Sequence, residues 1–144
     1  MDVDKYLVLG GIIAVLAAVL HIVVLIGGPD WIAYVKAPAS VVESARRGTW
    51  LAPVSILAIT GIIIICALYA FSGAGLLPKL PLLGYVLTLI GGLCLLRGLL
   101  LVPIIVMRPA LLSHLGAFDV ASSLVFVVMG AAYAAGAYRS LTAG

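Results

Sequence analysis

The chain has 144 residues, of which 65% are hydrophobic and 9% are charged, and its mean hydropathy is +1.36. Soluble domains carry about 45–50% apolar and about 25% charged residues, and a core of this size cannot bury so much apolar surface, whereas a bilayer can. The composition excludes a secreted disulfide scaffold, a disordered chain and a nucleic-acid-binding protein, and the net charge of +3 suits positions that flank membrane spans.

Four apolar runs follow one another along the chain, at residues 7–26, 51–71, 82–107 and 120–137. Each is long enough to cross roughly 30 Å of hydrocarbon as a helix, and the third is expected to bend or end near Pro103. The sequence therefore predicts an all-α, integral membrane, up-down four-helix bundle that forms a single transmembrane domain over residues 1–144. An even number of spans puts both termini on one face, which we call side A, and the opposite face is side B.

The connection between the first two runs, residues 27–50, contains a predicted short helix. Ser40 and Glu43 stand three residues apart, as in the S-x-x-E capping box whose side chains bind the free amides at a helix start. Two arginines follow at the negative end of the helix dipole, and Gly48 stands where a C-cap glycine is common. We expect an interfacial helix from about residue 41 to residue 47, in a connection that lies against the membrane as a lid or a collar.

Small residues lie at helical spacing in three of the runs, and in lipid such residues let helix backbones approach closely. The first run has Gly10, Ala14, Ala17 and His21 on one stripe, the third has Gly84, Thr88, Gly91 and Gly98, and the fourth has Gly130, Ala134 and Ala137. We expect the helices to face one another along these stripes, so that His21 points at other helices and away from lipid.

The polar residues of the spans are concentrated toward side B. On that side lie His21, Arg97, Asp119 and three serines, Ser55, Ser122 and Ser123. An arginine at the centre of a span costs about 2.5–3.5 kcal/mol on insertion, so Arg97 needs a partner or a polar cavity. We predict a polar pocket between the helices that opens toward side B and is covered by the 27–50 connection with Glu43. The A half of the bundle is expected to be nearly without polar groups.

Two interpretations of Arg97 stay open. It either forms a buried ion pair with Asp119 or Glu43 that fixes the register of the helices, or it anchors a carboxylate or phosphate through the paired hydrogen bonds of its guanidinium. His21 is likewise either a hydrogen-bonded histidine between helices, or a proton relay or metal ligand.

No cofactor is predicted. A haem held by His21 and His114 is not expected, because His114 stands in a short loop with no supporting partner visible in the sequence. No H-x-x-x-H motif or cluster of carboxylates indicates a metal site.

Four segments carry a resemblance to known sequences: HIVVLIGGPDWIAYV, ESARRGTWLAP, LYAFSGAGLLPKLPLL and LLRGLLLVP. The chain resembles, from His21 to about Tyr138, a group of small four-span proteins predicted in many bacterial genomes. The resemblance implies a multi-pass protein of the bacterial inner membrane, and it implies no activity.

Three functions are compatible with this pattern. The first is binding or carriage of a small anionic or amphipathic ligand, with Arg97 on the anion, hydrogen bonds from His21, Ser122 and Ser123, and the 27–50 connection controlling access. The second is a membrane enzyme acting on a lipid-soluble substrate, with His21 as acid or base. The third is a structural or accessory subunit of a membrane complex. The expected partners are membrane lipids, the anionic ligand, and further copies or subunits, without nucleic acid.

Overall fold

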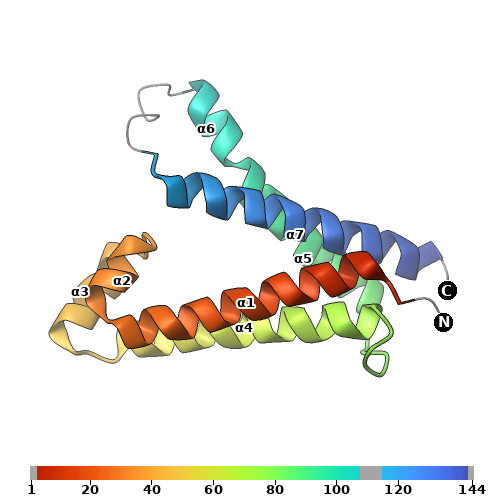
Figure 1. Ribbon diagram of the computed structural model, residues 1–144, viewed down its shortest axis with the longest axis horizontal. Helices are drawn as coiled ribbons and strands as arrows, with labels where there is room; N and C mark the ends of the chain where they lie inside the picture. Colours follow the sequence, from red (N-terminus) through yellow and green to blue (C-terminus); the bar gives the residue numbers. More distant parts are fainter. Residues whose placement is uncertain (1–2, 108–114, 143–144) are drawn as a thin grey trace. The chain divides into compact units, whose positions relative to one another are not determined.

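A computed structural model of the chain describes residues 3–107 and 115–142, apart from the side chains at 104 and 105. Within these ranges the chain forms helices and turns and no strand (Figure 1). The helices are α1 (Lys5–Gly27), α2 (Pro29–Tyr34), α3 (Ala39–Arg47), α4 (Leu51–Gly73), α5 (Leu83–Leu99), α6 (Leu101–Met107) and α7 (Ala117–Thr142). Four segments are long and apolar enough to cross a membrane: Lys5–Gly27, Leu51–Gly73, Leu83–Pro103 and Ala117–Thr142. The predicted all-α fold with four spans is confirmed.

The chain forms two compact units, and α1 and α4 each contribute to both. The first unit consists of Met1–Ile13 and Cys66–Gly144, and the second consists of Ala14–Ile65. The first unit therefore contains one end of α1, one end of α4, and the helices α5, α6 and α7. The single domain expected from the sequence stays a prediction.

In the first unit, α5 and α7 pack with their backbones in contact. A Cβ atom at Gly98 would lie 2.8 Å from the backbone nitrogen of Val127, and one at Gly130 would lie 2.7 Å from the backbone nitrogen of Leu95. Only glycine permits such an approach, so the predicted small-residue contact between the third and fourth spans is confirmed. Thr88 does not belong to it, because its side chain is exposed and donates a hydrogen bond to a carbonyl of its own helix.

Tyr133 joins the ends of α1 and α4 to α7 in the same unit. Its side chain is fully buried, and its hydroxyl donates to the carbonyl of Cys66 on α4 at 2.8 Å. Gly10 on α1 makes room for the ring, since a Cβ there would lie 2.9 Å from it. Leu7, also buried, occupies the space that the absent side chain of Gly136 leaves.

The third span is broken near Pro103, as expected. Helix α5 ends at Leu99 and α6 begins at Leu101. A proline has no N–H to give to the carbonyl four residues earlier, and its ring collides with that carbonyl. For Pro103 that residue is Leu99, which explains the position of the break.

The second unit contains the two short helices α2 and α3, which pack on the ends of the first two spans. Val24 of α1, Ile32 of α2 and Ile56 of α4 form a buried cluster, against which Val41 and Val42 of α3 pack. Helix α2 was not predicted, although a proline at its first position and an acidic residue in its first turn are typical of a helix start.

Helix α3 corresponds to the interfacial helix predicted over residues 41–47, but its start differs. The residue before its first turn is Pro38, and Ser40 already lies inside the helix, so the predicted capping box is wrong. Glu43 instead accepts a hydrogen bond from Arg47, with the two atoms 2.6 Å apart. Gly48 ends the helix in the left-handed conformation, at φ 66°, as predicted.

Candidate functional site

Arg97 lies at the contact between α5 and α7 in the first unit. The close approach at Gly98 puts the α5 backbone against α7 near Ser123 and Val127. The neighbouring Arg97 then extends along the surface of α7, where its guanidinium carbon lies 5.5 Å from the centroid of the Phe126 ring. Its side chain is exposed. The charge is thus placed over an aromatic face, an attractive arrangement for a cation.

Asp119 is not the partner of this arginine. Its carboxylate accepts the backbone N–H of Gly116 at 2.8 Å, which satisfies a free amide at the start of α7. Phe126 comes seven residues later, about 10 Å farther along the helix axis. No ion pair joins Arg97 to a carboxylate among the residues that the structure describes. The structure therefore places Arg97 on a ring and not beside Asp119.

The two predicted serines have different surroundings. Ser123 is buried, and its carbonyl oxygen would lie 2.9 Å from a Cβ at Gly98, so it belongs to the contact between α5 and α7. Ser122 is half-buried and donates its hydroxyl to the carbonyl of Asp119 at 3.1 Å.

His21 and Glu43, the remaining predicted ligand contacts, belong to the second unit. His21 is half-buried, and its Nδ1 lies 2.8 Å from the carbonyl oxygen of Ala17, one turn earlier on α1. A carbonyl can only accept, so Nδ1 carries a proton, and in the neutral imidazole the lone pair is on Nε2. Glu43 is engaged by Arg47. The binding roles of both residues stay predictions.

No group of three or more His, Cys, Asp or Glu residues within residues 3–107 and 115–142 is arranged to hold a metal ion. His114, the second residue of the haem arrangement, lies outside the described residues.

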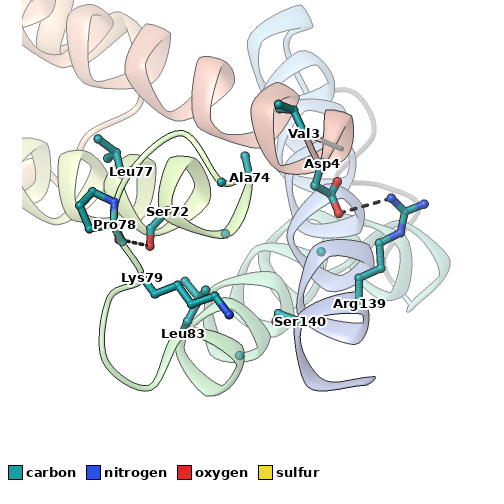
Figure 2. A pocket seen from close by; sticks show the side chains of 14 residues that line it. Val3, Asp4, Ser72, Ala74, Leu77, Pro78, Lys79, Leu83, Arg139 and Ser140 are labelled. Atoms are coloured by element: carbon teal, nitrogen blue, oxygen red, sulfur yellow. Dashed lines mark hydrogen bonds and ion pairs between the residues drawn. The ribbon is translucent and has the colours of Figure 1, made fainter. Parts of the chain in front are cut away.

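A polar hollow at the side-A end of the first unit was missed from the sequence. Its volume is about 690 Å³, and it is lined where the starts of α1 and α5 meet the ends of α4 and α7 (Figure 2). Successive spans therefore run in opposite directions in this unit. The polar side chains in its lining are Asp4, Ser72, Lys79, Arg139 and Ser140. These residues lie just outside the predicted spans, so the expectation that the A half of the bundle has almost no polar groups stays a prediction.

Asp4 and Arg139 join the first and last spans at this hollow. The Asp4 carboxylate accepts the backbone N–H of Tyr6 at 2.9 Å and that of Leu7 at 3.3 Å, and so caps α1. Its other oxygen lies 3.4 Å from a guanidinium nitrogen of Arg139. The same guanidinium lies 5.0 Å from the centroid of the Tyr6 ring. An aspartate directly before the first span is a signal from which the cap, but not the ion pair, could have been predicted.

Lys79 stands on the loop between α4 and α5, which Ser72 fixes on both sides of the lysine. The Ser72 hydroxyl donates to the carbonyl of Pro78 at 2.7 Å and accepts the N–H of Leu80 at 3.0 Å. Lys79 is exposed, and it has no ion pair with a described residue. Figure 2 shows its side chain extending from the loop toward Ser140 on α7.

Comparison of the chain with family models, with curated proteins and with solved structures finds no match.

Proposed function

We propose that this multi-pass membrane protein binds a small anionic or amphipathic molecule, whose anionic group is held by the Arg97 guanidinium. The observation that carries the proposal is the surroundings of the Arg97 side chain. It is an exposed arginine inside a membrane span, and its neighbour is the Phe126 ring and no carboxylate of the described residues.

The energetics support an additional partner. An arginine in a span costs about 2.5–3.5 kcal/mol, whereas a cation–π contact contributes about 0.5–2 kcal/mol. The ring contact therefore offsets only part of the cost. Among the described residues the guanidinium N–H donors also have no acceptor, and five such donors match the oxygens of a carboxylate or phosphate.

Charged residues inside membranes are expensive and mark ligand or ion sites by default. The Ser123 carbonyl faces Gly98, the residue that follows Arg97 on α5, and we assign Ser123 a supporting position in the helix contact. Direct roles for His21, Ser122, Asp119 and Glu43 remain part of the hypothesis. The resemblance to small bacterial four-span proteins supports a location in the bacterial inner membrane.

Native mass spectrometry of the mildly extracted protein tests the proposal, with Arg97→Met as the variant. Methionine keeps the span apolar and the stem of the side chain, and removes the charge. Arg47→Met is the matched control, because Arg47 is also exposed but already has a carboxylate partner in Glu43. We expect a discrete adduct on the wild type and on Arg47→Met and none on Arg97→Met, with all three proteins folded by circular dichroism.

The mass of the adduct would narrow the class of ligand. Equal adducts on Arg97→Met and on the wild type would contradict the role of Arg97. The absence of any adduct from the wild type would contradict ligand binding itself.

A second candidate function, an enzyme acting on a lipid-soluble substrate, is favoured by one observation. The hydrogen bond of His21 to Ala17 leaves Nε2 able to accept a proton. An adduct that changes mass on incubation with the wild type, and does not change with His21→Gln, would support it. An adduct of constant mass on both proteins would favour the binding role.

A further inference from the structure

The hollow at side A is separate from the Arg97 site. It lies at the start of α5, and Arg97 comes fourteen residues after Leu83, so the two are about 21 Å apart along the helix. Both belong to the first unit. An occupant of the hollow would therefore not be the molecule that Arg97 holds.

The charges in the hollow are not balanced. Lys79 and Arg139 contribute two positive charges to the lining, and Asp4 contributes one negative charge. The Asp4 carboxylate already accepts two backbone N–H groups and the Arg139 guanidinium. Lys79 is left without a carboxylate among the described residues. Among the described lining residues the net charge is thus +1, and the Lys79 ammonium has no carboxylate partner there.

Arg139 and the loop that carries Lys79 are both held in place by contacts within the chain. Arg139 is fixed between Asp4 and the Tyr6 ring, and the loop that carries Lys79 is fixed by Ser72 on both sides. Two cations that line one hollow suit an anion with several oxygens, because charge-assisted hydrogen bonds to phosphate are the strongest that these side chains make.

The surroundings of the hollow are those of a lipid headgroup. It lies at the ends of four apolar spans, which is the level of the membrane interface. The tyrosines near these ends, Tyr6, Tyr85 and Tyr138, are exposed, as are those that anchor proteins at this level. Leu76 and Leu77, on the same loop as Lys79, are also exposed. A molecule in the hollow would meet cations at one end and apolar side chains beside them.

We propose that this hollow binds the phosphate of an anionic phospholipid, with Lys79 and Arg139 as its two cationic contacts. The amphipathic surroundings favour a lipid over a free phosphate ester, and the placing of Arg139 and of the Lys79 loop around one hollow distinguishes a site from general attraction to the membrane surface.

The experiment measures lipid retention by native mass spectrometry, with the protein released from mixed micelles that contain phosphatidylglycerol and phosphatidylcholine. Lys79→Gln is the variant, since the lysine is exposed on a loop and its replacement leaves the Asp4–Arg139 pair intact. Lys5→Gln is the control, because it removes the same charge at the same end of the spans but does not line the hollow. Arg97→Met reports on the other site.

We expect the wild type to retain phosphatidylglycerol in preference to phosphatidylcholine. Lys79→Gln should lower that affinity about tenfold, the effect of one charge-assisted hydrogen bond. Lys5→Gln and Arg97→Met should keep the affinity for phosphatidylglycerol within about twofold of that of the wild type. An unchanged affinity in Arg97→Met separates this site from the proposed function of Arg97.

Equal affinities in Lys79→Gln and Lys5→Gln would overturn the proposal, because the charge would then act on the membrane as a whole. Equal retention of the two lipids by the wild type would overturn it as well. Displacement of the bound lipid by glycerol 3-phosphate would assign the hollow to a soluble phosphate ester and overturn the choice of a lipid.

Discussion

Replacing Gly130 with alanine should push α7 away from α5. The new Cβ would lie 2.7 Å from the backbone nitrogen of Leu95 and 3.0 Å from the carbonyl oxygen of Gly91, whereas ordinary contacts begin at 3.4 Å. Both neighbours are backbone atoms, so no side chain can rotate to make room. The two helices must separate locally by about 0.7 Å, the difference between 3.4 and 2.7 Å.

The energetic cost follows from two opposing effects. Overpacking a tight contact costs about 1–3 kcal/mol, while alanine is better than glycine in a helix by up to about 1 kcal/mol. Gly92→Ala is the matched control, because a Cβ at Gly92 has no atom within 4 Å and only the second effect applies. We therefore expect Gly130→Ala to be less stable than Gly92→Ala by about 1–3 kcal/mol.

The assay is unfolding of both variants and the wild type by titration with sodium dodecyl sulfate from the same mild detergent, followed by circular dichroism. Gly130→Ala should unfold at the lowest detergent fraction, and Gly92→Ala at a fraction equal to or above that of the wild type. If the two variants unfold together, the backbone contact at Gly130 does not hold these helices.

Two further changes test single hydrogen bonds by the same measurement. Tyr133→Phe should cost about 0.5–1.5 kcal/mol, because the hydroxyl that donates to Cys66 is lost, and the exposed Tyr138→Phe should cost nothing measurable; equal effects would contradict the buried bond. Ser44→Ala should cost about 1–3 kcal/mol, since it leaves a buried amide without an acceptor, whereas the exposed Ser40→Ala should be neutral. A larger loss of stability in Ser40→Ala than in Ser44→Ala would support the capping box after all.

The spans and the contact between α5 and α7 could be predicted because each produces a regular pattern of residues along the chain. An apolar run of sufficient length requires a helix in a membrane, and glycines such as Gly91 and Gly98 at helical spacing mark a face that another backbone can touch. The break at Pro103 was predictable for a similar reason, since the effect of a proline acts four residues back in its own helix.

Contacts between distant residues have no such pattern. The hydroxyl of Tyr133 and the carbonyl of Cys66 are 67 residues apart, and Asp4 and Arg139 are 135 residues apart. Each of these side chains taken alone is an ordinary interfacial or core residue. Their pairing depends on which helix ends meet, and periodicity does not contain that information.

The capping box failed because a local motif competes with its neighbours. When the helix begins at Ala39, after Pro38, Glu43 stands one turn before Arg47 and binds it at 2.6 Å. Ser44 is then buried, where its hydroxyl lies 2.7 Å from that of Thr49. The sequence has the S-x-x-E spacing, but Glu43 binds Arg47 and does not cap the start of the helix.

The two arginines of the first unit with aromatic contacts provide an internal comparison. Arg139 lies 5.0 Å from the centroid of the Tyr6 ring and 3.4 Å from a carboxylate oxygen of Asp4, so it has both a ring and an anion. Arg97 lies 5.5 Å from the centroid of the Phe126 ring and, among the described residues, has no anion. The arginine near the membrane interface, where water could solvate it, is the one whose charge is paired. The arginine inside the span, where an unpaired charge costs more, lacks that pairing. Pairing would be expected first for the arginine whose unpaired charge costs more, and the opposite is found. This is the physical reason to look for an anionic partner of Arg97 beyond the described chain.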